Sequence, residues 1–409
     1  MAYPRQSIEL SQSEFAELTR SFFNSPTDSG ETVRRFESLF ADFIGVGQAI
    51  AFASQRAGMY FVLKALDAKP GDEVIVPAYT FFSVPACVLL AGLVPIFVDV
   101  DSQTWNLDPS QAKAAITPRT RAIIVTHLNG CPADLDRLLE ITNETGIQLI
   151  EDCAQALGAT YHSKQVGSFG VGCFSFGEGK NLLAMGGGMV TTRDSRLASR
   201  LRKITDSFGN PPLARILSKW ANLLFLKTVT TPPIFTVTVF PWLYLSSLKN
   251  GEIDTDREHK VELMSVASFQ ERLCNAQAAL ALAQFESLNE RNQSRITNAQ
   301  TLSSELRGVK GIELPPIPHD RTHLYTHYAI RVRDRERFCK AMIRRGVDAQ
   351  RDYCSFCPAL PDFRSSPNRL KTPVAQALDG TIAYLPNQPQ LSSQNMSRIA
   401  LAVKTVVES

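Results

Sequence analysis

Hydrophobic and polar residues alternate along the chain in blocks that predict helices and strands in turn. Residues 31–44 carry apolar side chains at three- and four-residue spacing and precede Gly45, which is typical of an amphipathic helix. Beyond them, short apolar runs bounded by turn residues predict buried strands, and the longer segments between predict helices. The predicted strands are 73–77, 94–100, 121–128, 147–152, 171–176 and 187–192, and the predicted helices are 58–66, 83–92, 108–116, 133–146 and 195–205.

Strands that alternate with helices of about ten residues predict an α/β fold, with a parallel or mixed sheet covered by helices on both faces. Residues 273–306 then read as one long helix. The last part of the chain alternates again, with strands at 327–332 and 347–353, a helix at 335–346 and a final helix from Ser393.

This pattern and the length of 409 residues predict two domains. We expect an N-terminal arm and a large domain over 1–295, and a smaller α+β domain over 296–409.

An apolar segment interrupts the large domain at about 211–250 and is most apolar over 213–248. No charged residue lies between Thr228 and Leu248, a length that approaches a membrane span. Prolines argue against a single spanning helix, which leaves two interpretations. The segment packs on a subunit interface or over the substrate entrance, or it dips into a lipid surface with aromatic and basic residues at the headgroups. The residues concerned are Pro232, Pro233, Pro241, Trp220, Trp242, Tyr244, Lys219, Lys227 and Lys249.

Composition narrows the classes of protein that fit. Lys and Arg number 43 against 40 Asp and Glu, a net charge of +3. This balance lacks the basic excess of nucleic-acid-binding proteins, so we expect no nucleic-acid partner. The N-terminal residues contain no apolar signal sequence, and we expect a cytoplasmic protein.

The eight cysteines are widely spread and do not form the pattern of a disulfide framework. Cys354 and Cys357 make one CxxC motif, but neither a second pair nor a nearby histidine follows. We therefore expect no metal site.

Three segments carry residues that suit one cofactor. Asp152 ends a predicted strand, and Lys180 lies in the loop after the strand 171–176, where ligands bind in open α/β sheets. Residues 54–56, Ser-Gln-Arg, start a helix whose free N–H groups suit a phosphate. Together they fit pyridoxal 5'-phosphate (PLP): the lysine forms a Schiff base with the cofactor, and the carboxylate keeps its ring nitrogen protonated. Taken alone, each residue also fits a role without a cofactor. Lys180 could be an ordinary surface lysine, and Asp152 could cap a helix.

The chain resembles the DegT/DnrJ/StrS-type sugar aminotransferase family, PLP-dependent enzymes of fold type I. The similarity runs from about Glu31 to Val407, outside the apolar insert. Its most specific part is EDCAQ at 151–155 followed by SFGEGK at 175–180. The resemblance implies a large three-layer domain with a mixed sheet and a smaller C-terminal α+β domain. Further matching segments are 69–101, 121–136 and 186–192.

The resemblance also implies roles for single residues. Lys180 matches the Schiff-base lysine and Asp152 the partner of the ring nitrogen. Gln155 matches a group near the ring hydroxyl, Ser175 a phosphate-binding serine, and Phe81 the aromatic residue that stacks on the ring. Because the family's dehydratase branch carries a histidine in place of this lysine, Lys180 argues for the aminotransferases.

The chain departs from the family at several positions. Members usually have Ser-Gly-Thr at 54–56, so the threonine hydroxyl is missing and Arg56 is a candidate to replace it at the phosphate, or else points to solvent. A family asparagine that reaches a partner's phosphate is Gln270 here, and a His-Tyr pair is Asp352-Tyr353. These changes put the usual substrate pocket in doubt. We read His127, near the site by strand position, as structural or as a support for the residues that contact the cofactor.

We therefore expect a ping-pong aminotransferase, a homodimer that takes an amino group from glutamate and passes it to a keto-sugar. A nucleotide-linked sugar of polysaccharide or secondary-metabolite biosynthesis is the favoured acceptor. A lipid-linked or other carbonyl acceptor at a membrane, and a non-catalytic PLP-fold protein, are the alternatives.

Overall fold

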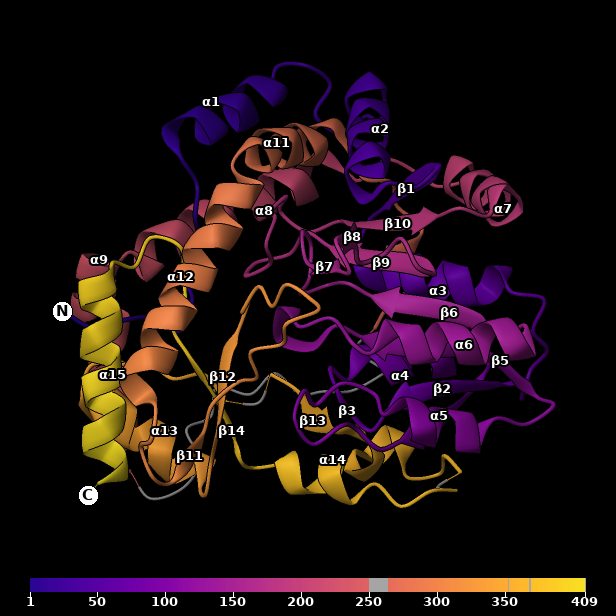
Figure 1. The fold of residues 1–409 in the computed structure, drawn as a ribbon. Coiled ribbons are helices and arrows are strands. Elements are labelled where there is room, and N and C mark those ends of the chain that lie inside the picture. The colour runs from indigo at the N-terminus through magenta and orange to yellow at the C-terminus, as the bar shows by residue number, and fades with distance from the viewer. Residues whose placement is uncertain (250–263, 352, 368, 409) are drawn as a thin grey trace.

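A seven-stranded sheet forms the centre of the large domain in the computed structural model, which describes residues 1–249, 264–351, 353–367 and 369–408 (Figure 1). The strand order is β1-β10-β9-β6-β5-β2-β4, in which β10 runs antiparallel to both neighbours and the other pairings are parallel. The predicted mixed sheet is thus confirmed. The strands are β1 (Gln48–Phe52), β2 (Glu73–Pro77), β4 (Val94–Val98), β5 (Thr120–Thr126), β6 (Gln148–Asp152), β9 (Val171–Ser175) and β10 (Gly188–Thr192).

Helices cover both faces of this sheet because successive strand residues point to opposite sides. In β2, Val74 and Val76 join one core cluster while Ile75 joins the other. The first cluster lies under α3 (Gln55–Ala65), α4 (Ser83–Leu90) and α7 (Ser195–Asp206). The second lies under α2 (Glu31–Ile44), α5 (Pro109–Ala115), α6 (Leu135–Thr145) and α11 (Asn275–Glu286).

A smaller antiparallel sheet, β11-β12-β14, packs with helices at the C-terminal end of the chain (Figure 1). A third core cluster joins it to α12, α13 and α15. The elements are β11 (Ile312–Glu313), β12 (Tyr328–Val332), β14 (Ile382–Leu385), α12 (Leu288–Leu306), α13 (Arg335–Arg344), α14 (Pro373–Leu378) and α15 (Ser393–Val407).

Two predicted elements are wrong. The single helix over 273–306 is two helices, α11 and α12, because Ser287 leaves helical geometry at φ −102° and ψ 7° and donates from its hydroxyl to the carbonyl of Gln284. The strand over 347–353 makes only single bridges among its described residues, Val347 with Tyr3 and Gln350 with Tyr384. It lies between two segments and forms a continuous ladder with neither.

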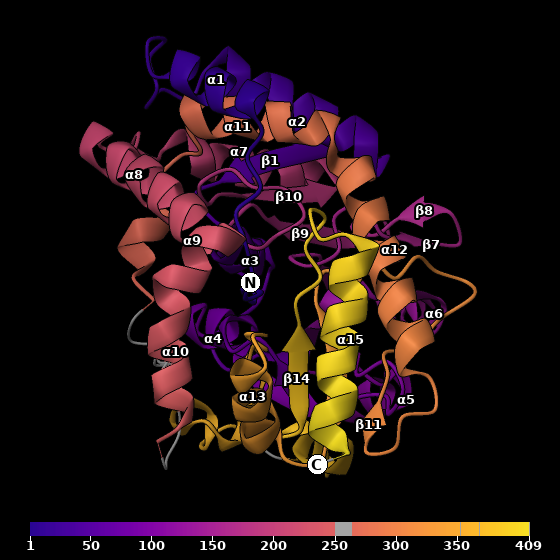
Figure 2. The same cartoon turned by 90° about the vertical axis from the view of Figure 1, so that its left-hand side faces the viewer.

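The apolar insert folds into three helices that follow one side of the molecule, α8 (Leu213–Thr230), α9 (Pro232–Val237) and α10 (Val239–Ser247) (Figure 2). Thr231 is extended at ψ 126° ahead of Pro232, so the proline breaks the run as expected. No described helix is both long and apolar enough to cross a membrane.

The outward side of the insert, which we call the insert face, exposes large apolar side chains. Of the three lysines expected at a lipid surface, Lys219 is half-buried with its amine near Gly186, and Lys227 donates to the carbonyl of Leu10. Both therefore turn inward, and Lys249 is exposed. The exposed apolar residues of the insert face are Leu213, Leu217, Phe225, Ile234, Val237, Trp242, Tyr244, Leu245 and Leu248.

Residues 1–10, the N-terminal arm, run between the insert and the C-terminal part of the chain, ahead of α1 (Gln12–Ser21) (Figure 2). Arg5 forms a bidentate ion pair with Asp348, in which Nε lies 2.9 Å from Oδ2 and Nη2 lies 2.8 Å from Oδ1. On the other side, the backbone N–H of Ala2 donates to Oγ1 of Thr236 in the insert at 2.9 Å. The arm thereby ties the insert to the small sheet and its helices.

Candidate active site

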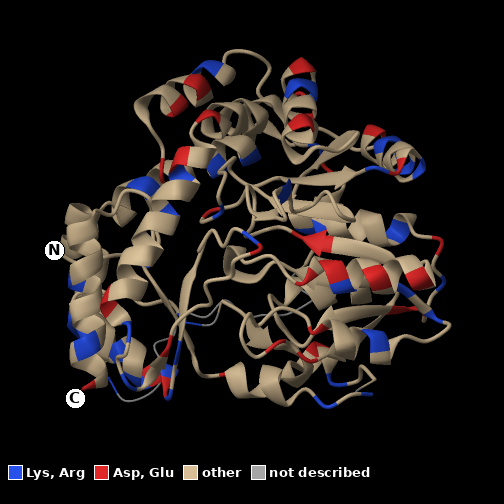
Figure 3. Ribbon diagram, viewed as in Figure 1, with Lys and Arg blue, Asp and Glu red and all other residues tan. Residues whose placement is uncertain are grey.

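Asp152 and Lys180 lie on neighbouring parts of the large sheet. Asp152 is the last residue of β6 and is paired with Cys173 of β9, and Lys180 follows β9 in the loop that leaves the same edge. The acidic tip of β6 is visible at the centre of the molecule (Figure 3). Sheet topology thus brings together two residues that the sequence analysis paired.

The carboxylate of Asp152 is buried, with 4% of the residue exposed. Its Oδ1 accepts hydrogen bonds from Nε2 of Gln55 at 3.1 Å and from the backbone N–H of Ala154 at 3.0 Å. Burial raises the pKa of this carboxyl, while the Ala154 hydrogen bond and the positive charge of Lys180 act in the opposite direction. A buried carboxylate of this kind favours a cationic partner, such as a protonated ring nitrogen.

Lys180 is held in a tight loop. Its backbone N–H bonds the carbonyl of Gly177, and Gly179 has φ +75°, a region that favours glycine. The Nζ of Lys180 donates to the hydroxyl of Tyr353 at 2.6 Å. A side chain at Gly179 would collide with Gln6 of the N-terminal arm, so the arm packs directly on the loop that carries the lysine.

The helix start at 54–56 differs in part from the prediction. Ser54 caps α3, since its hydroxyl accepts from the N–H of Ala57 at 3.1 Å. The buried side chain of Gln55 turns to Asp152 rather than to solvent, whereas Arg56 is exposed on the first turn. Gly188 of β10 lies so close that a Cβ there would collide with the backbone of Gln55. The helix start therefore sits against the sheet beside Asp152.

Three further predicted residues belong to the strand ends and loops near Asp152 and Lys180. Phe81 follows β3 (Tyr79–Thr80), and its ring centroid lies 5.6 Å from that of Tyr353. Ser175 ends β9 and is half-buried. Gln155 is buried, and its Oε1 accepts from the N–H of Asn129 at 2.8 Å.

A polar network beside Lys180 was not foreseen from the sequence. Asn181 donates through Nδ2 to Oδ1 of Asn292 at 2.8 Å and to Oγ1 of Thr326 at 3.0 Å. Thr326 in turn donates to the carbonyl of Gln155 at 2.6 Å. The only sequence signal is Asn181 directly after the lysine, because its partners are far along the chain.

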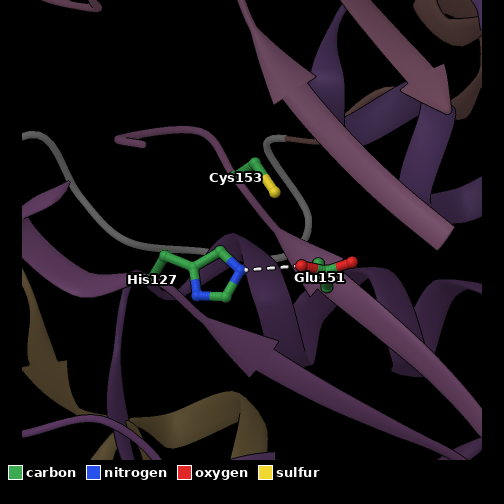
Figure 4. Close-up of side chains that lie close together, drawn as sticks. All are labelled: His127, Glu151 and Cys153. Carbon is green, nitrogen blue, oxygen red and sulfur yellow. Dashed lines mark hydrogen bonds and ion pairs between the residues drawn. The ribbon is translucent and has the colours of Figure 1, made fainter. Parts of the chain in front are cut away.

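His127, Glu151 and Cys153 form a buried cluster next to the site, which we call the brace (Figure 4). The Nδ1 of His127 accepts from the N–H of Ala133 at 3.1 Å, so the ring proton lies on Nε2, which faces Oε2 of Glu151 at 3.1 Å. The Glu151 carboxylate also accepts from the backbone N–H groups of Gly167 at 2.8 Å, Phe169 at 2.9 Å and Gly170 at 2.7 Å.

Cys153 lies beside this pair, and the ligand atoms of the three residues are within 4.8 Å of one another. Burial holds the pKa of the Cys153 thiol well above its ordinary value, so the thiol stays protonated. With the histidine and the carboxylate engaged in hydrogen bonds, the cluster acts as a structural brace. This geometry supports the structural reading of His127.

The CxxC cysteines flank β13 (Ser355–Phe356), which pairs with β3. Both are buried free thiols, and burial raises the pKa of Cys354 to about 12. They serve as packing beside the site. Of the positions where the chain departs from the family, Gln270 is exposed, and Asp352 lies outside the described residues.

Comparison with known proteins identifies the family. The model of the DegT/DnrJ/EryC1/StrS aminotransferase family matches residues 9–222 and 242–404, which leaves out the middle of the apolar insert. A UDP-N-acetyl-3-dehydro-α-D-glucosamine 3-aminotransferase of Acidithiobacillus ferrooxidans is 31% identical over 377 residues, covering 92% of this chain and 88% of the relative. GDP-perosamine synthase of Caulobacter vibrioides is 28% identical over 385 residues, covering 92% and 91%.

Solved structures agree. The crystal structure of DesV from S. venezuelae matches with a TM-score of 0.77 and 26% identity, over 97% of this chain and 95% of DesV. The fold class, the aminotransferase class and the resemblance read from the sequence are confirmed. The chain belongs to the DegT/DnrJ/EryC1/StrS aminotransferase family.

Proposed function

We propose that this chain binds PLP and transfers the amino group of an amino acid, with glutamate as the favoured donor, to the keto group of a nucleotide-linked sugar. One observation carries the proposal: the buried carboxylate of Asp152 ends strand β6, and the amine of Lys180 lies on the loop after the adjacent strand β9. The named relatives, which act on UDP- and GDP-linked sugars by their names, support the acceptor class.

The residues of the site fit the cofactor. The carboxylate of Asp152 is buried and forms no ion pair in the described structure, so it suits the protonated ring nitrogen. Gln55 orients this carboxylate through a hydrogen bond of 3.1 Å. By the family resemblance, Phe81 would stack on the ring and Gln155 would face the ring hydroxyl. The half-buried Ser175 and Arg56 would hold the phosphate with their side chains, and the start of α3 at Ser54 and Gln55 would offer its free backbone N–H groups.

Bound PLP supplies an electron sink that stabilises the negative charge left on the substrate carbon when its proton departs. Lys180 is the group that takes this proton and returns it. The Tyr353 hydroxyl, 2.6 Å from Nζ, fixes the direction of the amine. The network of Asn181, Thr326 and Asn292 fixes the backbone next to the lysine.

Borohydride labelling tests the proposal. Reduction of the PLP-loaded protein should attach the cofactor covalently to Lys180, as mass spectrometry of the peptides would show. Lys180→Ala should lose the label, while Lys164→Ala, which removes an exposed lysine of the same region, should keep it. Labelling of any residue other than Lys180 would contradict the assignment. A half-reaction with candidate amino acids, followed by keto-sugars, then defines donor and acceptor.

We also propose a homodimer in which a second copy of the chain covers the insert face. Two of the three lysines that a lipid interaction requires are turned inward, which favours a protein partner over a membrane. Exposed Trp242 and Leu245, at 54% and 61%, are the kind of side chains that interface cores bury. A cytoplasmic location stays a prediction, as does the division at residue 295.

Sedimentation velocity tests this assembly. Phe225→Ser with Leu245→Ser should convert the dimer to a monomer, while Phe23→Ser, which changes an exposed phenylalanine outside the insert, should not. Flotation on anionic vesicles is the competing outcome. If the wild type floats and the double variant does not, the insert face binds lipid, and a lipid-linked acceptor becomes the better reading.

A further inference from the structure

A small pocket beside Lys180 contains polar atoms that the fold leaves without partners. Residues 5–9 of the N-terminal arm close one side of it, and Lys180 lines it together with residues of α12 and the C-terminal part of the chain. Within the described part of the chain, the buried side-chain atoms in its lining that lack a hydrogen bond are Glu9 Oε1, Arg295 Nη1, His327 Nε2, Tyr384 Oη, Asn387 Oδ1 and Gln388 Oε1.

Arg295 of α12 is the most informative of these. The residue is 7% exposed, and the nearest acidic oxygen, Oε1 of Glu9, is 3.6 Å from Nη2, which is longer than a good hydrogen bond. The neighbouring Arg291 is instead held by Glu14 and Gln284. A buried guanidinium without a close counter-charge is costly in the folded protein, and an anion that reaches Nη1 would relieve that cost.

The charge around the pocket favours an anion. Charged residues gather where α12 passes the N-terminal arm (Figure 3). Of the basic residues in the lining, Arg5 and Arg291 are neutralised by Asp348 and Glu14, which leaves Lys180 and Arg295 against the single carboxylate of Glu9.

His327 lies within electrostatic reach of both Lys180 and Arg295, since both charges lower the pKa of its ring. Burial is the main cause, and the pKa falls to about 3, so the ring is neutral at physiological pH. Arg295 and Lys180 line the same pocket, so one small ligand in it can contact both.

We propose that Arg295 binds the carboxylate of the amino-acid donor and so determines donor specificity. The inference rests on the proposed function, because it places the donor at the amine of Lys180. The carboxylate of an α-amino acid is attached to the carbon that bears the reacting amine, so it must lie near the lysine. The phosphates of a nucleotide-linked sugar are a full sugar ring away from the reacting carbon.

The test uses PLP-loaded enzyme and glutarate, a dicarboxylate that has no amine to transfer. Glutarate should compete with the donor in the wild type. In Arg295→Gln its inhibition constant should rise about 10- to 100-fold, the loss expected for one charge-assisted hydrogen bond. Arg295→Lys should lie between, and Arg200→Gln, which removes a half-exposed guanidinium on α7, should match the wild type. Pyrophosphate forms the second arm, and its competition should not depend on Arg295.

Glu9→Gln keeps the inference testable if Arg295→Gln does not fold. Removing the nearest carboxylate should make glutarate bind more tightly, and unchanged or weaker binding would contradict the proposal. Equal glutarate binding in a folded Arg295→Gln, or dependence of pyrophosphate rather than glutarate on Arg295, would also overturn it. A wild type that converts no amino acid would instead refute the proposed function, so the two failures are distinguishable.

Discussion

The amine of Lys180 and the hydroxyl of Tyr353 are 2.6 Å apart, although 173 positions separate them in the sequence. The tyrosine ring packs against the rings of Phe81 at 5.6 Å and His327 at 4.2 Å. Burial raises the pKa of the Tyr353 hydroxyl, and the adjacent Lys180 only partly offsets this. The tyrosine therefore stays protonated at physiological pH and holds the lysine amine through its oxygen.

Tyr353→Phe should lower kcat about 10- to 100-fold and leave the fold intact. The ring contacts remain, but the hydrogen bond that directs Nζ is lost, and a bond to a charged group contributes about 1.5–3 kcal/mol. Stopped-flow absorbance of the donor half-reaction measures the rate, and circular dichroism controls for folding. An unchanged rate would show that the lysine needs no such support.

Asp152→Asn should separate stability from activity. The folded-state pKa of this carboxyl is raised from its ordinary 3.8, so its favourable contribution is present at low pH and is lost as pH rises through the raised pKa. At neutral pH the cofactor-free variant should thus be more stable than the wild type, by on the order of 1 kcal/mol. Below pH 4 the difference should vanish.

Activity should change in the opposite direction. With a neutral amide, the ring nitrogen loses its ionic partner, and transamination should fall below detection while the protein stays folded. Urea unfolding at several pH values and the donor half-reaction check the two halves separately. A variant that is less stable at neutral pH would refute the assigned pKa direction, and wild-type turnover would refute the assigned role.

Much of the fold could be read from the sequence because apolar runs mark buried strands. The strands from β2 to β10 that were predicted agree with the structure to within two residues at each end. The single long helix was wrongly predicted because its break depends partly on a contact distant in sequence. Ser287 ends one helix and starts another through contacts with Gln284 and Glu14, and Glu14 is far away in the sequence.

The placement of Lys180 and Asp152 near each other could be predicted, because each follows or ends one of two adjacent strands. The site was not predictable where a side chain had two available partners. Gln55 was placed at a phosphate, yet its amide bonds Asp152. Tyr353, Thr326 and Arg295 reach the site only through the packing of the small sheet and α12 on the large sheet, which no short spacing encodes.

Arg56→Ala tests the phosphate contact. If the exposed guanidinium folds over the phosphate, as the family's missing threonine leads us to expect, the PLP dissociation constant should rise about 10- to 100-fold. Arg34→Ala, an exposed arginine in the first turn of α2, is the matched control and should bind PLP as the wild type does. Fluorescence titration of cofactor-free protein gives the constant. Equal binding by both variants would mean that Arg56 points to solvent.

Glu151→Gln should destabilise the protein strongly although the residue does not touch the reacting groups. The carboxylate accepts three backbone N–H groups and faces the protonated Nε2 of His127. An amide turns one of these acceptor positions into a donor, and His127 cannot compensate by moving its proton, because Nδ1 already accepts from Ala133.

At least one buried donor is then left unpaired, which costs about 1–3 kcal/mol, and more where an ionised acceptor is lost. Urea unfolding of the cofactor-free protein should show a loss of at least about 2 kcal/mol. Glu144→Gln, which breaks an exposed pair with Lys113, should stay within about 0.5 kcal/mol of the wild type. If both variants unfold alike, the brace contributes nothing. If the prediction holds, the PLP dissociation constant of Glu151→Gln should rise as well, because Asp152 follows directly on the strand that the brace anchors.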